Sequence, residues 1–260
     1  MEKKKKPYCT AIVLAAGRGK RMGTKVQKQY LLLAGRPVLY YALRVFQDSE
    51  IIDEILLITG KGEEAYCREE IVEKYDFTKV SRILAGGEER YDSVWKGLQE
   101  TKPEGYVFIH DGARPFIEEK MLERVFQEVQ EQKACVVGMP VKDTIKVVNS
   151  RCDVTETPDR STLWLVQTPQ VFETELIRKA YKMLMQGRIS AEADPSETEK
   201  KQEKVEKVYT VTDDAGVVEA MLKHPVRLTE GSYMNIKITT PEDLLIGEAF
   251  AQRRQKEGEK

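Results

Sequence analysis

The chain has 260 residues, 42 of them basic and 43 acidic, which gives a formal net charge of −1 at pH 7. This length suits one large α/β domain or two small ones, and the charge argues against a general nucleic-acid binder. No apolar run is long enough for a membrane span, and the lysines at 3–6 precede no signal-peptide core. We therefore expect a cytoplasmic protein that binds neither nucleic acid nor membranes.

The first predicted strand, residues 11–14, is an apolar run of the kind buried in a parallel sheet. It leads into a turn of small and basic residues: Ala15, Ala16, Gly17, Arg18, Gly19, Lys20 and Arg21. Backbone N–H groups ringed by cations favour a phosphate, with Lys25 and Lys28 adding charge downstream. A solvated strand-to-helix turn is the alternative. The spacing matches neither the dinucleotide fingerprint nor the P-loop.

Strands and helices are then predicted to alternate as far as residue 139. The strands are 55–59, 80–85, 106–109 and 134–139, and the helices between them are 38–46, 63–75, 90–100 and 121–129. This alternation predicts a three-layer, mostly parallel Rossmann-like sheet with right-handed crossovers. Ligands of such sheets bind at the carboxyl ends of the strands. The basic turn, the Gly86-Gly87 turn and the 111–115 turn all fall at such ends, so we expect one crevice.

The pattern changes after Pro140. Residues 141–148 and 154–157 predict a β-hairpin, which packs either on a second subunit or on its own domain. We expect one domain over 7–254, with 141–160 as a protruding arm and 186–207 as a flexible charged insertion without assigned function. The remaining predicted elements are a strand at 163–166, a helix at 173–185, an N-cap at 212–214, strands at 226–229 and 235–238, and a final helix from Pro241.

Several polar residues follow buried strands and are candidates for chemistry. Asp111 suits Mg²⁺, which binds one or two carboxylates plus substrate phosphates, or else an ion pair with Arg114, Arg21 or Lys28. Lys237 lies in an apolar alternation and faces either solvent or the crevice. The four cysteines are scattered and the chain has only two histidines, which does not favour a disulfide framework or a histidine metal site.

Other cations and hydroxyls suit a phosphorylated polyol, although each of these residues taken alone is more often an ordinary polar or charged residue on the surface. They are Arg114, Thr144, Lys146, Arg160, Thr168 and Thr212. No Ser/His/Asp or Cys/His set has persuasive spacing. These cations, hydroxyls and the carboxylate of Asp111 therefore favour phosphoryl or nucleotidyl transfer without a covalent intermediate.

Nine sequence blocks in order make the chain resemble the 2-C-methyl-D-erythritol 4-phosphate cytidylyltransferase family. The blocks are LAAGRGKRM, KQYL, GGEERYDSV, HDGARPF, DTIK, DR at 159–160, TPQVF, TDDA and NIKITTPEDL. The resemblance covers residues 9–250. It implies a nucleotidyltransferase sheet, transfer of CMP from CTP to 2-C-methyl-D-erythritol 4-phosphate, use of Mg²⁺, and a homodimer joined through the hairpin arm.

The resemblance also implies roles for individual residues. The cytidine would contact Ala15, Ala16, Gly17, Gly19, Gly87, Glu88 and Ser93, and the triphosphate would contact Arg21, Lys28 and Lys237. Asp111, with Gly112, would lie beside Mg²⁺ and the ribose-phosphate end. Thr144 and Arg160 of a partner subunit would reach the methylerythritol phosphate, together with Arg114, Thr168 and Thr212.

Two other functions remain open at this stage. Ribitol-5-phosphate cytidylyltransferase shares the scaffold, although Gly112-Ala113 and the DTIK block fit the methylerythritol family better. A non-catalytic nucleotide-binding regulatory protein is the other, and the joint presence of Arg21, Lys28, Asp111 and Lys237 argues against it. The chain has Gln27 where the family usually has proline, which we expect to loosen the loop before Lys28.

Overall fold

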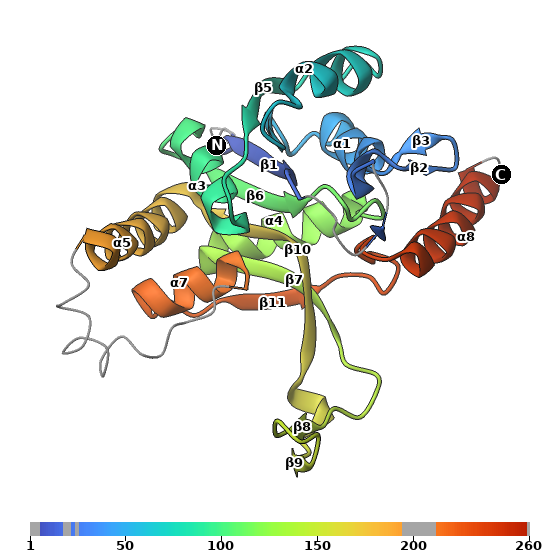
Figure 1. Cartoon of the computed structure of the whole chain (residues 1–260). Helices are drawn as coiled ribbons and strands as arrows, with labels where there is room; N and C mark the ends of the chain where they lie inside the picture. The colour runs from blue at the N-terminus through green and yellow to red at the C-terminus, as the bar shows by residue number, and fades with distance from the viewer. Residues whose placement is uncertain (1–5, 18–21, 24–25, 194–211, 259–260) are drawn as a thin grey trace, which may run out of the picture.

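Seven strands form one sheet in the order β11-β7-β10-β6-β1-β4-β5 (Figure 1). Their bounds are β1 (Cys9–Ala15), β4 (Glu54–Thr59), β5 (Val80–Ala85), β6 (Tyr106–Asp111), β7 (Ala134–Pro140), β10 (Trp164–Glu173) and β11 (Arg227–Glu230). The computed structural model describes residues 6–17, 22–23, 26–193 and 212–258. The mixed, mostly parallel sheet confirms the predicted fold class.

Helices cover both faces of this sheet. One face carries α1 (Val38–Asp48), α2 (Glu64–Tyr66), the π-helical η3 (Cys67–Glu73) and α4 (Glu119–Gln132), and the other carries α3 (Arg90–Glu100), α5 (Thr174–Ala193) and α7 (Asp214–Leu222). Successive side chains of β1 point to opposite faces of the sheet, which is why two hydrophobic cores form. Val13 packs in the core under α1 and α4, and Ile12 packs in the core under α3, α5 and α7. The three predicted layers are therefore present.

Strand β10 is the one that runs against its neighbours. It pairs antiparallel with both β6 and β7, whereas β1 pairs parallel with β4 and β6. It is also much longer than the strand predicted at 163–166. The reason is the connection: β7 leads into a hairpin rather than a helix, so the chain returns along the sheet in the opposite direction.

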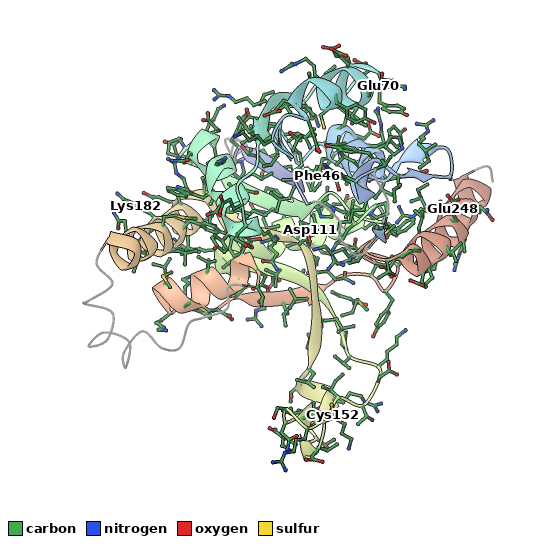
Figure 2. All side chains as sticks on the ribbon, in the orientation of Figure 1. Phe46, Glu70, Asp111, Cys152, Lys182 and Glu248 are labelled. Carbon is green, nitrogen blue, oxygen red and sulfur yellow. The ribbon has the colours of Figure 1, made fainter. Side chains whose placement is uncertain are left out.

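The hairpin extends away from the sheet as an arm (Figure 1), which we define as residues 141–163. It contains β8 (Val147–Val148), β9 (Val154–Glu156) and the short helix η4 (Arg160–Thr162). The Val141 N–H donates to the Leu163 carbonyl at 3.0 Å where the arm begins and ends. Figure 2 shows Cys152 at the far end of the arm, well separated from Asp111. The two strands are shorter than predicted.

A small satellite core lies beside the main sheet. It is formed by a two-stranded ribbon of β2 (Leu32–Leu33) and β3 (Arg36–Pro37) together with the last helix, α8 (Pro241–Gly258). Ile238 is fully buried in this core, and its N–H donates to the Ala113 carbonyl at 2.8 Å. The strand predicted at 235–238 is wrong, because this alternation anchors a loop rather than pairing with a strand.

The charged tract is partly helical. Helix α5 continues to Ala193, so the first residues of the predicted insertion at 186–207 belong to it, and the rest lie outside the described residues. All four cysteines are free thiols, three of them buried, as expected. Among the described residues, no helix is both long and apolar enough to cross a membrane.

Candidate active site

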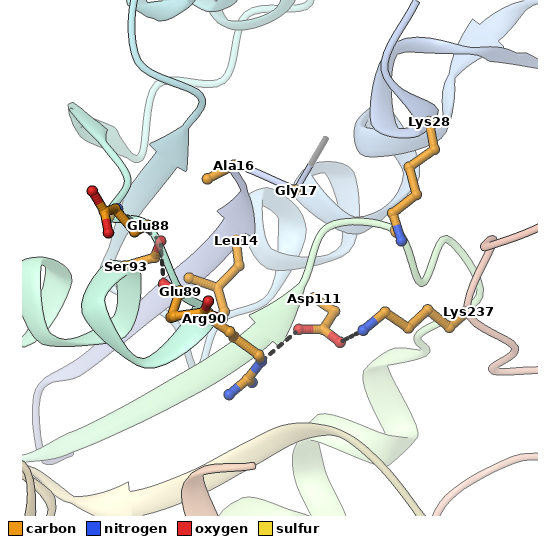
Figure 3. A pocket seen from close by; sticks show the side chains of 12 residues that line it. Leu14, Ala16, Gly17, Lys28, Glu88, Glu89, Arg90, Ser93, Asp111 and Lys237 are labelled. Carbon is orange, nitrogen blue, oxygen red and sulfur yellow. Dashed lines mark hydrogen bonds and ion pairs between the residues drawn. The ribbon is translucent and has the colours of Figure 1, made fainter. Parts of the chain in front are cut away.

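A cleft of about 190 Å³ opens where β1 and β6 end, beside the turn between β5 and α3 (Figure 3). Its lining residues are Leu14, Ala16, Gly17, Lys28, Gly87, Glu88, Glu89, Arg90, Ser93, Asp111, Ala113 and Lys237. All three turns expected to converge contribute to it. The carboxyl ends of parallel strands share one edge of a sheet, which is why segments far apart in sequence meet here.

The glycine turn approaches the end of β1 very closely. A Cβ at Gly86 would lie 2.5 Å from the Ala16 Cβ and 2.9 Å from the Ser93 Oγ, so a side chain there would push the turn away. The Ser93 hydroxyl accepts from the Gly87 N–H at 3.0 Å and donates to the Glu89 carbonyl at 3.3 Å. Ser93 is buried and shapes this turn, while the neighbouring Glu88 is exposed.

Asp111, the last residue of β6, is held by two cations, one on each carboxylate oxygen. Lys237 Nζ donates to Oδ2 at 2.6 Å, and Arg90 Nε donates to Oδ1 at 3.2 Å (Figure 3). Burial alone would raise the pKa of Asp111, but Arg90 and Lys237 outweigh it and hold that pKa well below its usual range. Asp111 is therefore an anion that accepts on both oxygens, with partners that differ from the ones expected.

Arg90 is itself anchored behind the cleft by Asp214, the first residue of α7. Its Nη1 and Nη2 donate to the two oxygens of that carboxylate at 3.0 and 2.8 Å. Asp214 is fully buried and also accepts from the Tyr181 hydroxyl at 2.5 Å. Sequence reasoning missed Arg90 and Asp214. The available signal was a cation in the first turn of α3, which opposes the helix dipole unless a carboxylate pairs with it.

Lys28 reaches the cleft from the opposite side. It begins the short 3-10 helix η2 (Lys28–Tyr30), and its ammonium group points toward Asp111 (Figure 3). The next residue, Gln29, is buried, and its Nε2 donates to the carbonyl of Ala15 at 2.5 Å. The end of β1 and the segment carrying Lys28 are thus joined directly.

Gln27, the residue expected to loosen the loop before Lys28, makes side-chain hydrogen bonds with two other residues. Its Oε1 accepts from Gln29 Nε2 at 2.5 Å, and its Nε2 donates to Glu63 Oε1. The other oxygen of Glu63 accepts from the Tyr30 hydroxyl at 2.9 Å. These hydrogen bonds hold the Gln27 side chain in the described part of the loop, and the loosening expected from Gln27 stays a prediction.

Arg114 and Thr168 do not line the cleft. Arg114 Nη1 donates to the Asn235 carbonyl at 2.8 Å, and the Thr168 Oγ1 accepts from the Asp111 N–H at 3.1 Å. The Thr168 hydroxyl also meets His110 Nδ1 at 3.0 Å, while His110 Nε2 lies 3.1 Å from the Arg114 carbonyl. Burial lowers the pKa of His110 to about 4, so the ring is neutral at pH 7 and supports the end of β6.

The residues predicted on the arm lie outside the cleft of this single chain. Thr144 and Arg160 are exposed, and Arg160 Nη1 donates to the Lys142 carbonyl at 2.9 Å. Thr212 is exposed just before α7. None of these three side chains lines the cleft of a single subunit.

Of four further residues predicted to contact the nucleotide, two lie in the described part of the chain. Ala15 is buried at the end of β1, and Gly112 packs so closely that a Cβ there would lie 2.7 Å from Leu39 Cδ1. Arg21 and Gly19 lie outside the described residues. Ala15 and Gly112 therefore shape the wall behind the cleft.

Comparison with known proteins agrees with this architecture. The profile of the family described as 2-C-methyl-D-erythritol 4-phosphate cytidylyltransferase matches residues 9–253. A protein of that name from Lachnoclostridium phytofermentans is 44% identical over 248 residues, covering 95% of this chain and 97% of the relative. One from Lachnospira eligens is 45% identical over 241 residues, covering 93% and 98%.

Solved structures give the same result. The crystal structure of 4-diphosphocytidyl-2C-methyl-D-erythritol synthase from Anaerococcus prevotii superposes with a TM-score of 0.75 at 31% identity, covering 95% of this chain and 96% of that one. A 2-C-methyl-D-erythritol 4-phosphate cytidylyltransferase from Thermus thermophilus gives a TM-score of 0.67 at 30% identity, covering 93% and 98%. With a family profile that spans nearly the whole chain and relatives above 40% identity, the chain belongs to the 2-C-methyl-D-erythritol 4-phosphate cytidylyltransferase family, enzymes of isoprenoid-precursor synthesis.

Proposed function

We propose that the cleft around Asp111 is where this enzyme binds CTP and transfers CMP to 2-C-methyl-D-erythritol 4-phosphate. The family's reaction yields 4-diphosphocytidyl-2-C-methyl-D-erythritol and pyrophosphate. The observation that carries the assignment is that Lys28 and Lys237 line one cleft together with Asp111, beside the Gly86-Gly87 turn. A triphosphate needs concentrated positive charge, and a base needs a close-fitting backbone.

The nucleoside end of CTP is assigned to the glycine turn. Gly17 and Gly87 line the space between the end of β1 and the start of α3, with Ala16 on one wall, and the cytosine and ribose are assigned to this space. Ser93 and Ala15 support these walls from behind, and Glu88 lies at the exposed rim. Ser93 would act on the base through its hydrogen bond with the Gly87 N–H.

The phosphate end is assigned to the cations. A phosphate oxygen of the acceptor attacks the α-phosphorus of CTP in line, the new P–O bond forms, and the bond to pyrophosphate breaks. Lys28 and Lys237 stabilise the charge that builds up on the α-phosphate and the leaving group, together with Arg21. Lys28 and Lys237 already line the cleft before the nucleotide arrives.

Asp111 fits a magnesium ion that arrives with the nucleotide. Mg²⁺ keeps several waters and takes one or two carboxylates plus substrate phosphates, so a single buried carboxylate is a sufficient protein ligand. Among the described residues, no three Asp, Glu, His or Cys side chains gather into a complete metal site. Mg²⁺ would supply charge neutralisation between the phosphates, and Asp111 would orient it.

We further propose a homodimer in which the arm of one subunit completes the acceptor site of the other. The arm exposes apolar side chains that a partner would cover: Ile145, Val147, Val148 and Val154. Thr144 and Arg160 would then reach the acceptor phosphate beside Arg114, Thr168 and Thr212. The free cysteines suit a reducing compartment, and we place the enzyme in the cytoplasm.

Pyrophosphate release tests the reaction itself. The purified protein with CTP and Mg²⁺ is offered 2-C-methyl-D-erythritol 4-phosphate, ribitol 5-phosphate or no acceptor. We expect release with the first acceptor, and a nucleotide product of matching mass. Release with ribitol 5-phosphate alone, or none with either acceptor, would contradict the proposal.

Mixed dimers test the arm. A Lys28→Ala subunit and an Arg160→Ala subunit are each expected to be poorly active alone. When they are mixed, one intact site forms from the unmodified cleft of one subunit and the unmodified arm of the other, so part of the activity returns. Mixed dimers that form but show no recovery would place each site within one subunit.

A further inference from the structure

Behind the cleft lies an ion pair between the fully buried Asp214 and the partly buried Arg90 that folding alone does not explain. The Asp214 carboxylate has no exposed surface and holds both terminal nitrogens of Arg90, as described above. Burying two charges costs free energy that their attraction only partly repays, and an apolar pair of similar volume would stabilise a fold at least as well. The pair is better explained by the contact that the remaining guanidinium nitrogen of Arg90, Nε, makes.

The Nε atom of Arg90 contacts Asp111. The guanidinium of Arg90 is planar and presents Nε, Nη1 and Nη2 in a fixed arrangement, so two nitrogens on Asp214 determine where the third points. Nε then lies 3.2 Å from Asp111 Oδ1. Because Arg90 is held by the fully buried Asp214 and the Asp111 side chain is only 11% exposed, Asp111 Oδ1 has little freedom to turn.

The second oxygen of Asp111 is held quite differently. Its partner is Lys237 Nζ at 2.6 Å, and the side chain of Lys237 is 38% exposed. An ammonium on a flexible four-carbon chain exchanges partners easily, whereas a bidentate arginine does not. The two oxygens of one carboxylate therefore have unequal partners, one fixed and one exchangeable.

We infer that Arg90 is a positioning residue: anchored on Asp214, it fixes Asp111 Oδ1 so that Oδ2 is the oxygen offered to a magnesium–nucleotide when Lys237 turns to the phosphates. This inference rests on the role of Asp111 given under Proposed function. It assigns the free protein a built-in exchange, in which Lys237 occupies the oxygen that the incoming metal takes over. In this step the hydrogen bond from Lys237 to Asp111 Oδ2 breaks and that oxygen becomes available to the metal, while no covalent bond of the protein changes.

The test compares variants that keep or break the bridge. Arg90→Lys keeps a cation for Asp214 but cannot reach two carboxylates at once. The double variant Arg90→Gln with Asp214→Asn removes both buried charges together, so that neither is left unpaired. Asp111→Asn, alone and combined with Arg90→Lys, closes a double-mutant cycle, and Arg82→Lys, from an exposed pair with Glu100, is the matched control.

Two measurements are made on each purified variant. Calorimetric binding of CTP is followed across Mg²⁺ concentrations, and kcat and KM for CTP are determined at low and saturating Mg²⁺. Circular dichroism and thermal unfolding show which variants fold. The CTP–Mg²⁺ titration does not depend on turnover, so it reports on the site even in inactive variants.

We expect Arg90→Lys and the double charge-removal variant to need about 10- to 100-fold more Mg²⁺ for CTP binding, the range typical of residues that orient a metal ligand. Saturating Mg²⁺ should restore most of kcat, and Arg90→Lys should add little in the Asp111→Asn background. Arg82→Lys should behave as the unmodified protein.

Two results would overturn the inference, and they differ in what else they remove. Folded Arg90 variants with unchanged Mg²⁺ dependence, or with the same loss in the Asp111→Asn background, would refute the positioning role alone. An Asp111→Asn protein with unchanged CTP binding and turnover would refute the proposed role of Asp111 as well.

Discussion

The cleft and the arm are both polar, yet they are stabilised in opposite ways. In the cleft, Asp111 on β6 is joined through Arg90 on α3 to Asp214 on α7, so three elements far apart in sequence share one buried network. On the arm, the side-chain bonds are local and exposed, such as Lys146 to Thr157 and Asn149 to Asp153.

This difference bears on the proposed dimer. In the cleft, Asp111 is paired with Arg90 and Lys237 of the same subunit, so the cleft is formed before a ligand arrives. The arm instead leaves Val148 and Val154 about half exposed, with apolar surface that only another surface can bury. Nucleotide binding is thus expected to be a property of the subunit, and acceptor binding a property of the pair.

The largest effect on stability should follow from breaking the buried pair. Asp214→Ala leaves the Arg90 guanidinium without its bidentate partner inside the protein, and we expect a loss of about 3–5 kcal/mol in the free energy of unfolding. Asp153→Ala on the arm removes an exposed carboxylate and should change it by less than about 0.5 kcal/mol. Urea unfolding of both variants measures this, and equal losses would contradict the contrast.

Next in size is the effect of the cleft cation on catalysis. Lys28→Ala should fold normally and lower kcat by about 10²–10³-fold, the usual result of removing one preorganised donor to a developing charge. Arg151→Ala at the tip of the arm should leave kcat within about twofold. Steady-state kinetics decides, and near-normal turnover in Lys28→Ala would remove Lys28 from the mechanism.

The buried imidazole under the cleft should make the subunit sensitive to acid. The pKa of His110 is lowered from 6.5 to about 4, so the unfolded chain binds a proton in this range that the native state does not. Stability should therefore fall as pH falls through this window, by about 1.4 kcal/mol per unit and about 3 kcal/mol in all. Asp111, whose pKa is lowered, acts in the same direction only below its ordinary pKa of about 3.9.

Urea unfolding at pH 7 and pH 4.5 checks this, with His110→Gln as the comparison. The variant loses the titrating group, so its stability should depend much less on pH over this range, whatever its absolute value. The arm contains no histidine and should contribute nothing here. An identical pH dependence in both proteins would show that His110 is not responsible.

The smallest effect on folding, but a clear one on assembly, is expected from the arm. Val148→Ser combined with Val154→Ser replaces exposed apolar side chains, so the stability of the subunit should change by less than about 0.5 kcal/mol per site. Sedimentation equilibrium should nevertheless show weaker dimers. Unchanged self-association would mean that other surfaces hold the subunits together.

Local sequence determined most of the elements and their order. The strand at 80–85 and the helix at 90–100 have the predicted bounds, and Asp213 caps α7 as expected, accepting from the Gly216 N–H at 2.9 Å. These features depend on periodicity and on hydrogen bonds within a few residues, which a reader of the sequence can count. The resemblance of nine blocks supplied the reaction as well.

The tertiary structure alone decided which charges meet. Arg90 pairs with Asp214 across 124 positions and Lys237 with Asp111 across 126, and no local pattern distinguishes these partners from other charged residues nearby. The same holds for β10, whose direction depends on where the arm returns the chain. Burial makes the choice, because a charge removed from water must find its opposite within a few ångströms, wherever in the sequence that opposite lies.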